Sequence, residues 1–256
     1  MFLKFRILLL LLVLATVALS AWRANYRLTA WEHSIHVAIY PIAGDNTSGT
    51  TGFIRDLSQD HFNEIGQWLQ GETERHGFSV LQPVSFQLAP TLTDKPPSPP
   101  RQASPLEAIL WSLQMRWWAW QHDAISGPKP DIRLFILYHD PEHQAQLPHS
   151  VGLGRGQVGV IHAFASISQR QQNAVVITHE LLHTFGATDK YNQSTLQPLF
   201  PEGYAEPQRQ PRLPQRVAEI MGGRIPLDEH QAEIPASLVS TIIGPETARE
   251  IGLLRP

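Results

Sequence analysis

An apolar run from Ile7 to Trp22 sets the first limit on how this chain can fold, because so long an apolar segment suits a membrane better than water. Lys4 and Arg6 precede the run, and a basic flank followed by about 15 apolar residues is typical of an export signal. Small residues at 17–21 offer a cleavage site, so residues 1–24 are predicted to be either a signal peptide or an uncleaved membrane anchor. Both alternatives export the rest of the chain and leave the basic end in the cytoplasm. We expect a single-pass anchored protein on the periplasmic side of a bacterial inner membrane, or a secreted one if the segment is cleaved.

Residues 25–256 are predicted to form one domain. The full chain has 42% hydrophobic and 17% charged residues, which is an ordinary composition for a globular protein. The net charge of −3 argues against nucleic acid as a partner, because nucleic-acid binding usually needs a concentrated basic face. The chain has no cysteine, so any metal must be held by nitrogen and oxygen donors. The sequence gives no indication of the oligomeric state.

Strand patterns and helix patterns alternate along this domain. Predicted strands cover 33–44, 84–89, 131–140 and 157–164, and predicted helices cover 58–77, 104–122 and a segment around 174–185. This order predicts an α/β fold in which helices flank a mixed, twisted sheet. The strand at 157–164 is expected at the edge of that sheet, entered by a flexible loop with glycines at 152, 154 and 156. That glycine spacing fails the dinucleotide-binding pattern, because no helix opens after it.

The helix at 104–122 begins with a capping box formed by Ser104 and Glu107. Its apolar residues lie on one stripe: Leu106, Ile109, Leu110, Leu113, Trp117 and Trp120. A wide apolar stripe usually packs on a core, so core packing is the prediction for this face. A surface that contacts a membrane or a ligand is the alternative.

The segment THELLHTFGATDKY, residues 178–191, carries the strongest functional signal. At 100° per residue, His179 and His183 share one face of a helix, while Ala174, Ile177, Leu181 and Phe185 share the opposite face. The apolar face can therefore dock on a core without burying the histidines. Two imidazoles one turn apart can reach one metal ion, and Glu180 projects close to that ion without having to bind it.

Two residues after the helix complete a candidate metal site. Gly186 can end the helix because glycine accepts a positive φ, and the chain can then turn Asp189 back towards the histidines. Two imidazole nitrogens, one carboxylate oxygen and an open fourth position form the arrangement expected of catalytic zinc. Asp189 could instead only cap the turn. The full spacing arises by chance in fewer than about one in ten thousand shuffled chains, so composition alone explains it poorly.

With these residues the chain resembles the metzincin clan of zinc metalloendopeptidases. His179, Glu180, His183 and Gly186 match the motif, and Asp189 stands where most members carry a histidine and the snapalysin-like branch carries an aspartate. The resemblance implies a mixed sheet, an active-site helix, one catalytic Zn²⁺ and a C-terminal helix, here from about Pro245. It also implies a methionine in a tight turn beneath the metal.

Met221, followed by Gly222 and Gly223, fits that implied Met-turn, and it is the only methionine after the motif. Members with a tyrosine two residues past the methionine use it near the metal, whereas this chain has Gly223 there. Tyr191 and Tyr204 are candidate replacements for stabilising the oxyanion.

The expected activity is hydrolysis of peptide bonds by metal-activated water, with Glu180 as general base. By resemblance, an extended polypeptide substrate would pair with the free edge of the strand at 157–164. The alternative is a catalytically degenerate, zinc-containing binding or assembly module of the cell envelope; an exported α/β domain with a metal-free histidine cluster is a further one. Four other histidines are expected to be solvated or packed rather than to bind a second metal: His139, His143, His149 and His162.

Overall fold

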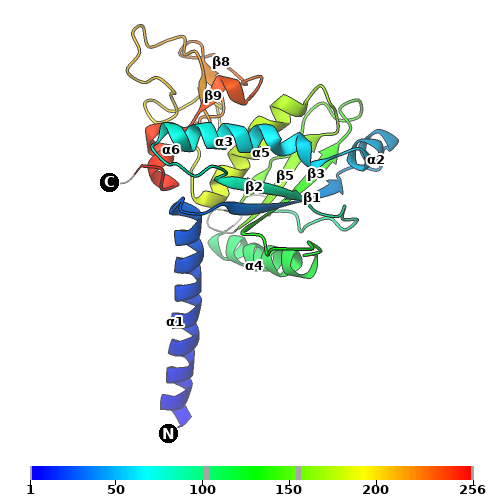
Figure 1. The fold of residues 1–256 in the computed structure, drawn as a ribbon, viewed down its shortest axis with the longest axis vertical. Coiled ribbons are helices and arrows are strands. Elements are labelled where there is room, and N and C mark those ends of the chain that lie inside the picture. The colour runs from blue at the N-terminus through cyan, green and yellow to red at the C-terminus, as the bar shows by residue number, and fades with distance from the viewer. Residues whose placement is uncertain (1, 101–103, 154–156, 255–256) are drawn as a thin grey trace.

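A five-stranded sheet forms the centre of the computed structural model, which describes residues 2–100, 104–153 and 157–254 (Figure 1). The strands are β1 (Ile35–Ala43), β2 (Val84–Leu88), β3 (Ile132–His139), β4 (Val151–Gly152) and β5 (Val158–Phe164). Their order across the sheet is β2-β1-β3-β5-β4, and all neighbours are parallel except β4 and β5. With helices on both faces of a mixed sheet, the predicted α/β fold class is confirmed.

The edge of the sheet differs from the prediction. β5 is not an edge strand, because β4 pairs with it, Val151 opposite Val160 and Gly152 opposite Gly159. The chain before β5 turns back on itself and adds two antiparallel residues, a segment too short for a hydrophobic pattern to reveal. Gly152 lies in β4, whereas the glycines at 154 and 156 lie outside the described residues.

Side chains alternate along the strands and give the sheet two apolar faces. Val37 and Ile39 of β1 belong to a core shared with α3 and α5, whereas Tyr40 and Ile42 belong to a second core that includes Met115 of α4. The helices of the domain are α2 (Ser48–Arg55), α3 (Asn63–Arg75), α4 (Pro105–Gln121), α5 (Arg170–Phe185) and α6 (Pro245–Glu250), with a short 3-10 turn η1 (Gln59–Phe62) before α3. α2 was not expected from the sequence, and α6 begins at Pro245 as predicted.

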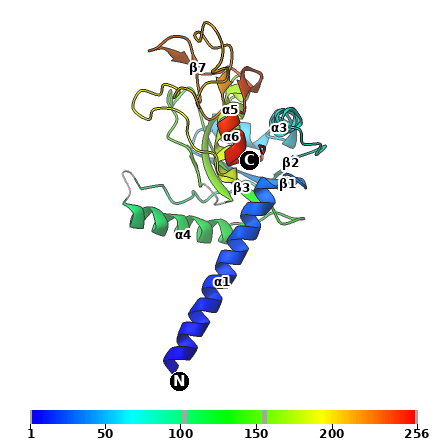
Figure 2. The ribbon, with the colours of Figure 1, turned by 90° about the vertical axis from the view of Figure 1, so that its left-hand side faces the viewer.

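The apolar N-terminal segment is a single helix, α1 (Phe2–Thr29), which extends away from the sheet and its helices (Figures 1 and 2). Among the described residues it is the one helix that is long and apolar enough to cross a membrane. Its last turn and the residues that follow join the domain: Leu28 and Trp31 are buried, the Trp31 indole N–H donates to the Ile251 carbonyl at 2.7 Å, and Arg27 pairs with Asp131. This helix is consistent with an N-terminal segment that directs export or anchors the chain in a membrane.

α4 has the predicted bounds and capping box, but the predicted packing of its apolar stripe is wrong. Met115 and Ala119 are buried against the sheet, and they lie on the side of the helix opposite the stripe. The stripe itself points into solvent, with exposed fractions of 57–68%: Leu106, Ile109, Leu110, Leu113, Trp117 and Trp120. Periodicity located the stripe correctly, but it could not show that a second apolar face of the same helix contacts the core.

The chain after α5 is mostly irregular. Four two-residue strands form two small pairs: β6 (Ala218–Glu219) with β9 (Thr241–Ile242), and β7 (Ile225–Pro226) with β8 (Ala232–Glu233). A 3-10 turn, η2 (Leu238–Ser240), precedes β9, and α6 follows it. This part of the chain packs against α5 through buried residues such as Ile220, Met221 and Ile251. It thereby surrounds the end of α5 that carries the histidines.

Candidate metal centre

α5 presents its two faces as the periodicity predicts. Ala174, Ile177, Leu181 and Phe185 are buried in the core against the sheet. The side chains of His179 and His183 remain 14% and 16% exposed. The helix ends at Gly186, whose φ of +111° lies in the left-handed region that glycine tolerates. The core therefore fixes the helix and turns both imidazoles outward.

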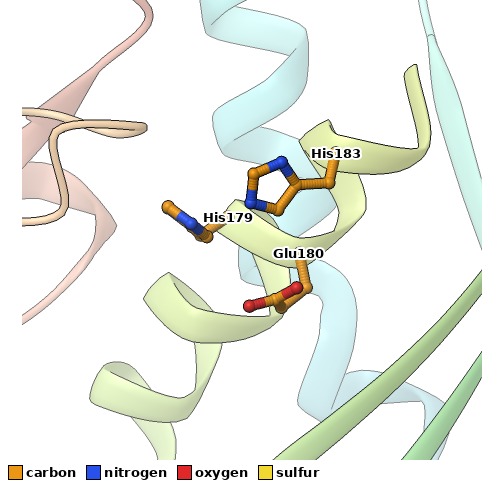
Figure 3. Close-up of side chains that lie close together, drawn as sticks. All are labelled: His179, Glu180 and His183. Atoms are coloured by element: carbon orange, nitrogen blue, oxygen red, sulfur yellow. The ribbon is translucent and has the colours of Figure 1, made fainter. Parts of the chain in front are cut away.

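The imidazoles and the neighbouring glutamate form one cluster. The ligand atoms of His179, Glu180 and His183 all lie within 4.8 Å of one another. Figure 3 shows the two rings one turn apart along α5, with the Glu180 carboxylate beside them. Glu180 is buried and both histidines are partly buried, and a group this close together could hold a metal ion.

Asp189 joins the cluster through the turn after Gly186. One carboxylate oxygen, Oδ1, lies 3.1 Å from Nε2 of His179 and 3.2 Å from Nε2 of His183. The turn is anchored by Glu250 of α6, which accepts from the Thr188 N–H at 2.9 Å and from the Lys190 ammonium at 2.7 Å. These bonds on both sides of Asp189 hold it over the histidines.

The hydrogen bond at Nδ1 of each ring determines whether Nε2 carries a proton or a lone pair. Nδ1 of His179 donates to the Ile220 carbonyl at 2.9 Å, and Nδ1 of His183 donates to the Ala187 carbonyl at 2.8 Å. A carbonyl only accepts, so in a neutral ring the proton sits on Nδ1 and Nε2 carries a lone pair. Both lone pairs then face one carboxylate oxygen, and only a cation, whether a proton or a metal ion, makes that arrangement favourable.

The charges of the cluster shift its pKa values. Burial opposes protonation of His179, but the hydrogen bond with Asp189 and the charge of Glu180 outweigh it, so the net pKa of His179 is raised. Burial also raises the pKa of Glu180, and the two histidines oppose that effect only in part. Asp189 has a lowered pKa, because hydrogen bonds and charges from both histidines outweigh its partial burial. The cluster therefore favours an ionised Asp189 facing bases that attract a cation.

Glu180 differs from the histidines of the cluster because one of its carboxylate oxygens has no partner in the described part of the chain. Its Oε2 is buried and has no hydrogen-bond partner among the described residues. β4 passes directly over it: a Cβ added to Gly152 would lie 2.5 Å from the His183 Cβ and 3.3 Å from Glu180 Oε2. A glycine is thus required where β4 crosses the histidine helix, and the carboxylate lies between the helix and the edge strand.

Met221 lies in the chain that passes beneath His179. It is fully buried in a turn in which the N–H groups of Gly222 and Gly223 donate to the Glu219 carbonyl at 3.0 and 3.1 Å. The Glu219 carboxylate is also fully buried and accepts from the Gly222 N–H and the Thr247 hydroxyl, both at 2.7 Å. This turn presents the Ile220 carbonyl to His179.

Two supporting residues escaped the sequence analysis. Glu219 holds the turn beneath His179, and Glu250 holds the turn that carries Asp189. Their partners lie far away in the chain, Thr247 in one case and Thr188 in the other. No local pattern signals such bonds, although Glu219 stands only two residues before the singled-out Met221.

A cleft of about 290 Å³ opens beside the cluster, and a neighbouring hollow of about 390 Å³ covers the histidines and Asp189. Both are lined by His149, His179, Glu180 and Tyr191. The Tyr191 ring lies 6.4 Å from the His179 ring between centroids. Tyr204 is buried and packs on Phe200 instead. A larger hollow, of about 1260 Å³, lies elsewhere, between α1 and α4, and it contains none of these residues.

His139 and His162 form a separate pair of histidines. His139 Nε2 and His162 Nδ1 lie 2.8 Å apart, and His162 also lines the cleft. Burial, and secondarily the neighbouring His139, lowers the pKa of His162 to about 4. Within residues 2–100, 104–153 and 157–254 the structure shows no second group of three side chains placed to bind a metal.

Comparisons with known proteins assign neither a family nor a function to this chain. No family model matches the chain, and no curated protein matches it in sequence. The fold and the cluster on α5 are therefore the basis for a functional conclusion.

Proposed function

We propose that the chain is an exported, membrane-anchored zinc-dependent endopeptidase of the metzincin clan. The observation that carries the proposal is the convergence of three donor atoms: Nε2 of His179, Nε2 of His183 and Oδ1 of Asp189. Two ligands of a tetrahedral zinc ion are about 3.4 Å apart when each bond is about 2.0–2.2 Å long. The observed separations of 3.1 and 3.2 Å suit that spacing.

The donor set favours zinc in a catalytic role. Two imidazoles and one carboxylate are common zinc ligands, and three protein ligands leave a fourth position for water. Each imidazole is oriented by a backbone carbonyl on its other nitrogen, as is usual for metal-binding histidines. His179, His183 and Asp189 would hold the ion, which when bound lowers the pKa of a water molecule and polarises a carbonyl group.

Glu180 supplies the proton transfer in this proposal. Its carboxylate lies within 4.8 Å of the ligand nitrogens of both histidines, and its Oε2 has no hydrogen-bond partner among the described residues. Burial raises its pKa, which brings the carboxylate closer to the range in which it can accept a proton and release it again. Glu180 would take the proton of the attacking water and deliver it to the leaving amine.

The substrate in this proposal is an extended polypeptide. β4 ends the sheet beside Glu180 and lines the hollow over the cluster, so its outer edge can pair with one more strand. Gly152 lets β4 lie close against His183 and Glu180, which brings this edge of the sheet next to the cluster. Tyr191, which lines the cleft, is the candidate for stabilising the oxyanion.

Attachment to the membrane through α1 is the second part of the proposal. The helix runs unbroken through the small residues at 17–21 to the buried Leu28, and the buried Trp31 follows its end at Thr29. An uncleaved anchor of this kind would hold the catalytic domain at the periplasmic surface. N-terminal sequencing of the protein from a membrane fraction distinguishes the anchor from a cleaved signal peptide.

The full chain and its Glu180→Gln variant test the catalytic proposal. We expect one zinc per chain in both proteins by elemental analysis, hydrolysis of an unfolded protein by the parent, and a loss of at least about 100-fold in the variant. A parent chain that binds zinc but cleaves nothing would favour the binding or assembly module. A chain that binds no metal after dialysis against zinc would refute both.

A further inference from the structure

The exposed stripe of α4 is an apolar feature of the domain that the proposed activity does not use. At 100° per residue its six residues fall within an arc of about 100°, directly opposite Met115 on the buried side. Two of them, Trp117 and Trp120, contact each other with tilted rings whose centroids lie 5.1 Å apart. Tryptophan, with its apolar ring and polar N–H, is enriched where a protein meets the surface of a bilayer.

The position of α4 relative to α1 indicates that the stripe faces the side of the domain where a membrane would lie. In both views α4 lies at the side of the domain from which α1 extends, and it runs across the direction of α1 (Figures 1 and 2). The end of α4 also lies near α1: Arg116 and Trp120 line the same hollow as Arg23 and Arg27. A bilayer crossed by α1 would therefore lie close beneath α4.

The charges on α1 mark the depth of that bilayer. From Arg6 to Arg23 the helix rises about 26 Å, which is close to the roughly 30 Å thickness of a hydrocarbon core. Arg23 would thus sit at the outer surface, at the level of the hollow that it shares with Arg116. The stripe residues next to this level would face the acyl boundary rather than water.

The hollow between the two helices is rich in cations. Arg27 is paired with Asp131 and Arg133 with Asp123. Arg23, Arg116 and Lys129 make no ion pair within the part of the chain that the structure describes. Three unpaired cations beside an apolar stripe complement the headgroups of anionic lipids.

We propose that α4 is a second membrane contact, an interfacial helix whose stripe inserts into the outer surface of an anionic bilayer. α1 would fix the distance to the membrane, and α4 would fix the rotation of the domain about α1. Because α4 and α5 pack on opposite faces of the sheet, this orientation turns the histidine helix away from the lipid. The inference rests on α1 crossing a membrane and is independent of the peptidase activity.

The absence of cysteine makes a direct test possible, since each introduced cysteine carries the only spin label. Leu110→Cys places the label on the stripe, and Ala108→Cys places it on the opposite, also exposed, side of the same turn. Val239→Cys, 86% exposed in η2, serves as a control in water. The full-length chains are placed one per nanodisc, in phosphatidylethanolamine with phosphatidylglycerol, and collisions with oxygen and with a water-soluble nickel chelate are measured.

We expect the Leu110 label to lie about 5–10 Å below the lipid phosphates, open to oxygen and closed to nickel, while both controls remain open to nickel. Replacing phosphatidylglycerol by phosphatidylcholine should make the Leu110 label shallower, and an unchanged depth would refute the role of the cations. A Leu110 label as open to nickel as Val239 would overturn the membrane contact. Protection from both reagents, with spin–spin broadening at two chains per disc, would overturn it in favour of a second copy. Leu113→Cys repeats the measurement one turn further along the stripe.

Discussion

Asp189 is the residue on which the candidate metal centre depends most, because its Oδ1 faces two imidazole nitrogens at once. Its other oxygen accepts from the Gln193 amide at 3.0 Å, so a carboxamide of the same shape could keep the turn while losing the charge. Asp189→Asn therefore separates a metal ligand from a residue that only shapes the loop. We expect it to weaken zinc binding by at least about 100-fold, since even loss of an outer-shell partner costs 10–100-fold.

Competition with a fluorescent zinc chelator measures that affinity. The matched control is Asp56→Asn, which alters an exposed carboxylate distant from the cluster in the chain and paired only with Arg55. Equal zinc affinity in the parent and in Asp189→Asn would show that Asp189 is a turn cap and not a ligand.

His162 gives the molecule a pH dependence outside the metal cluster. Its pKa of about 4 in the folded protein lies below the ordinary value of about 6.5, so between these values the unfolded chain binds a proton that the folded chain does not. The contribution of His162 to the free energy of unfolding should therefore be fully present above about pH 6.5 and should decrease as the pH drops towards 4. Because the ring is partly exposed, we expect the loss to be about 1–2 kcal/mol.

His162→Gln removes this titration and keeps a polar partner for His139. Urea unfolding of the detergent-solubilised full chain at several pH values between 4 and 7 should give a flatter curve for the variant than for the parent. Parallel curves for the two proteins would mean that His162 is protonated normally in the folded state.

At the scale of single elements, the left-handed end of α5 positions the turn that bears Asp189. A Cβ at Gly186 would meet no atom closer than 3.7 Å, so the cost of Gly186→Ala comes from its φ of +111° alone. We expect a loss of about 1–2 kcal/mol in the free energy of unfolding and weaker zinc binding. Gly71→Ala, inside α3 with open space around it, is the control and should stabilise the chain by about 0.5–1 kcal/mol. Equal effects at both sites would contradict a backbone constraint at Gly186.

The elements also show what the sequence could and could not predict. α5 was placed well because its apolar residues recur at helical spacing and pack on the core, although burial extends beyond that face to Thr178, Leu182 and Thr184. α4 was bounded correctly by its capping box, but two apolar faces left the direction of packing undetermined. β4 has only two residues, and Glu219 acts through Thr247 and Gly244, so neither leaves a local pattern. Prediction therefore succeeded where a helix has a clear periodic pattern and packs on the core through its apolar stripe. It failed where contacts with segments distant in the sequence determine the structure.

At the scale of the whole molecule, the candidate site joins two parts of the chain that otherwise meet through apolar packing. α5 belongs to the layer over the sheet, while residues 187–223 form the irregular part around its end. His179 is bonded to Ile220 and contacts Asp189, so it touches that irregular part at two points. An ion held between His179, His183 and Asp189 would fasten the irregular part to the sheet layer.

Metal removal should consequently loosen one part of the molecule more than the other. A metal ion that binds only the folded chain stabilises it by about 2.7 kcal/mol at a concentration 100-fold above its Kd, so chelation should lower the unfolding temperature. Hydrogen exchange should show the lost protection in residues 187–191 and 218–223, while β1 and β3, which pair with each other in the sheet, keep theirs. Glu180→Gln should behave as the parent in this measurement, because the glutamate is not a proposed ligand. Uniform loss of protection across the sheet would instead indicate that the ion supports the entire fold, and no change at all would place the metal elsewhere.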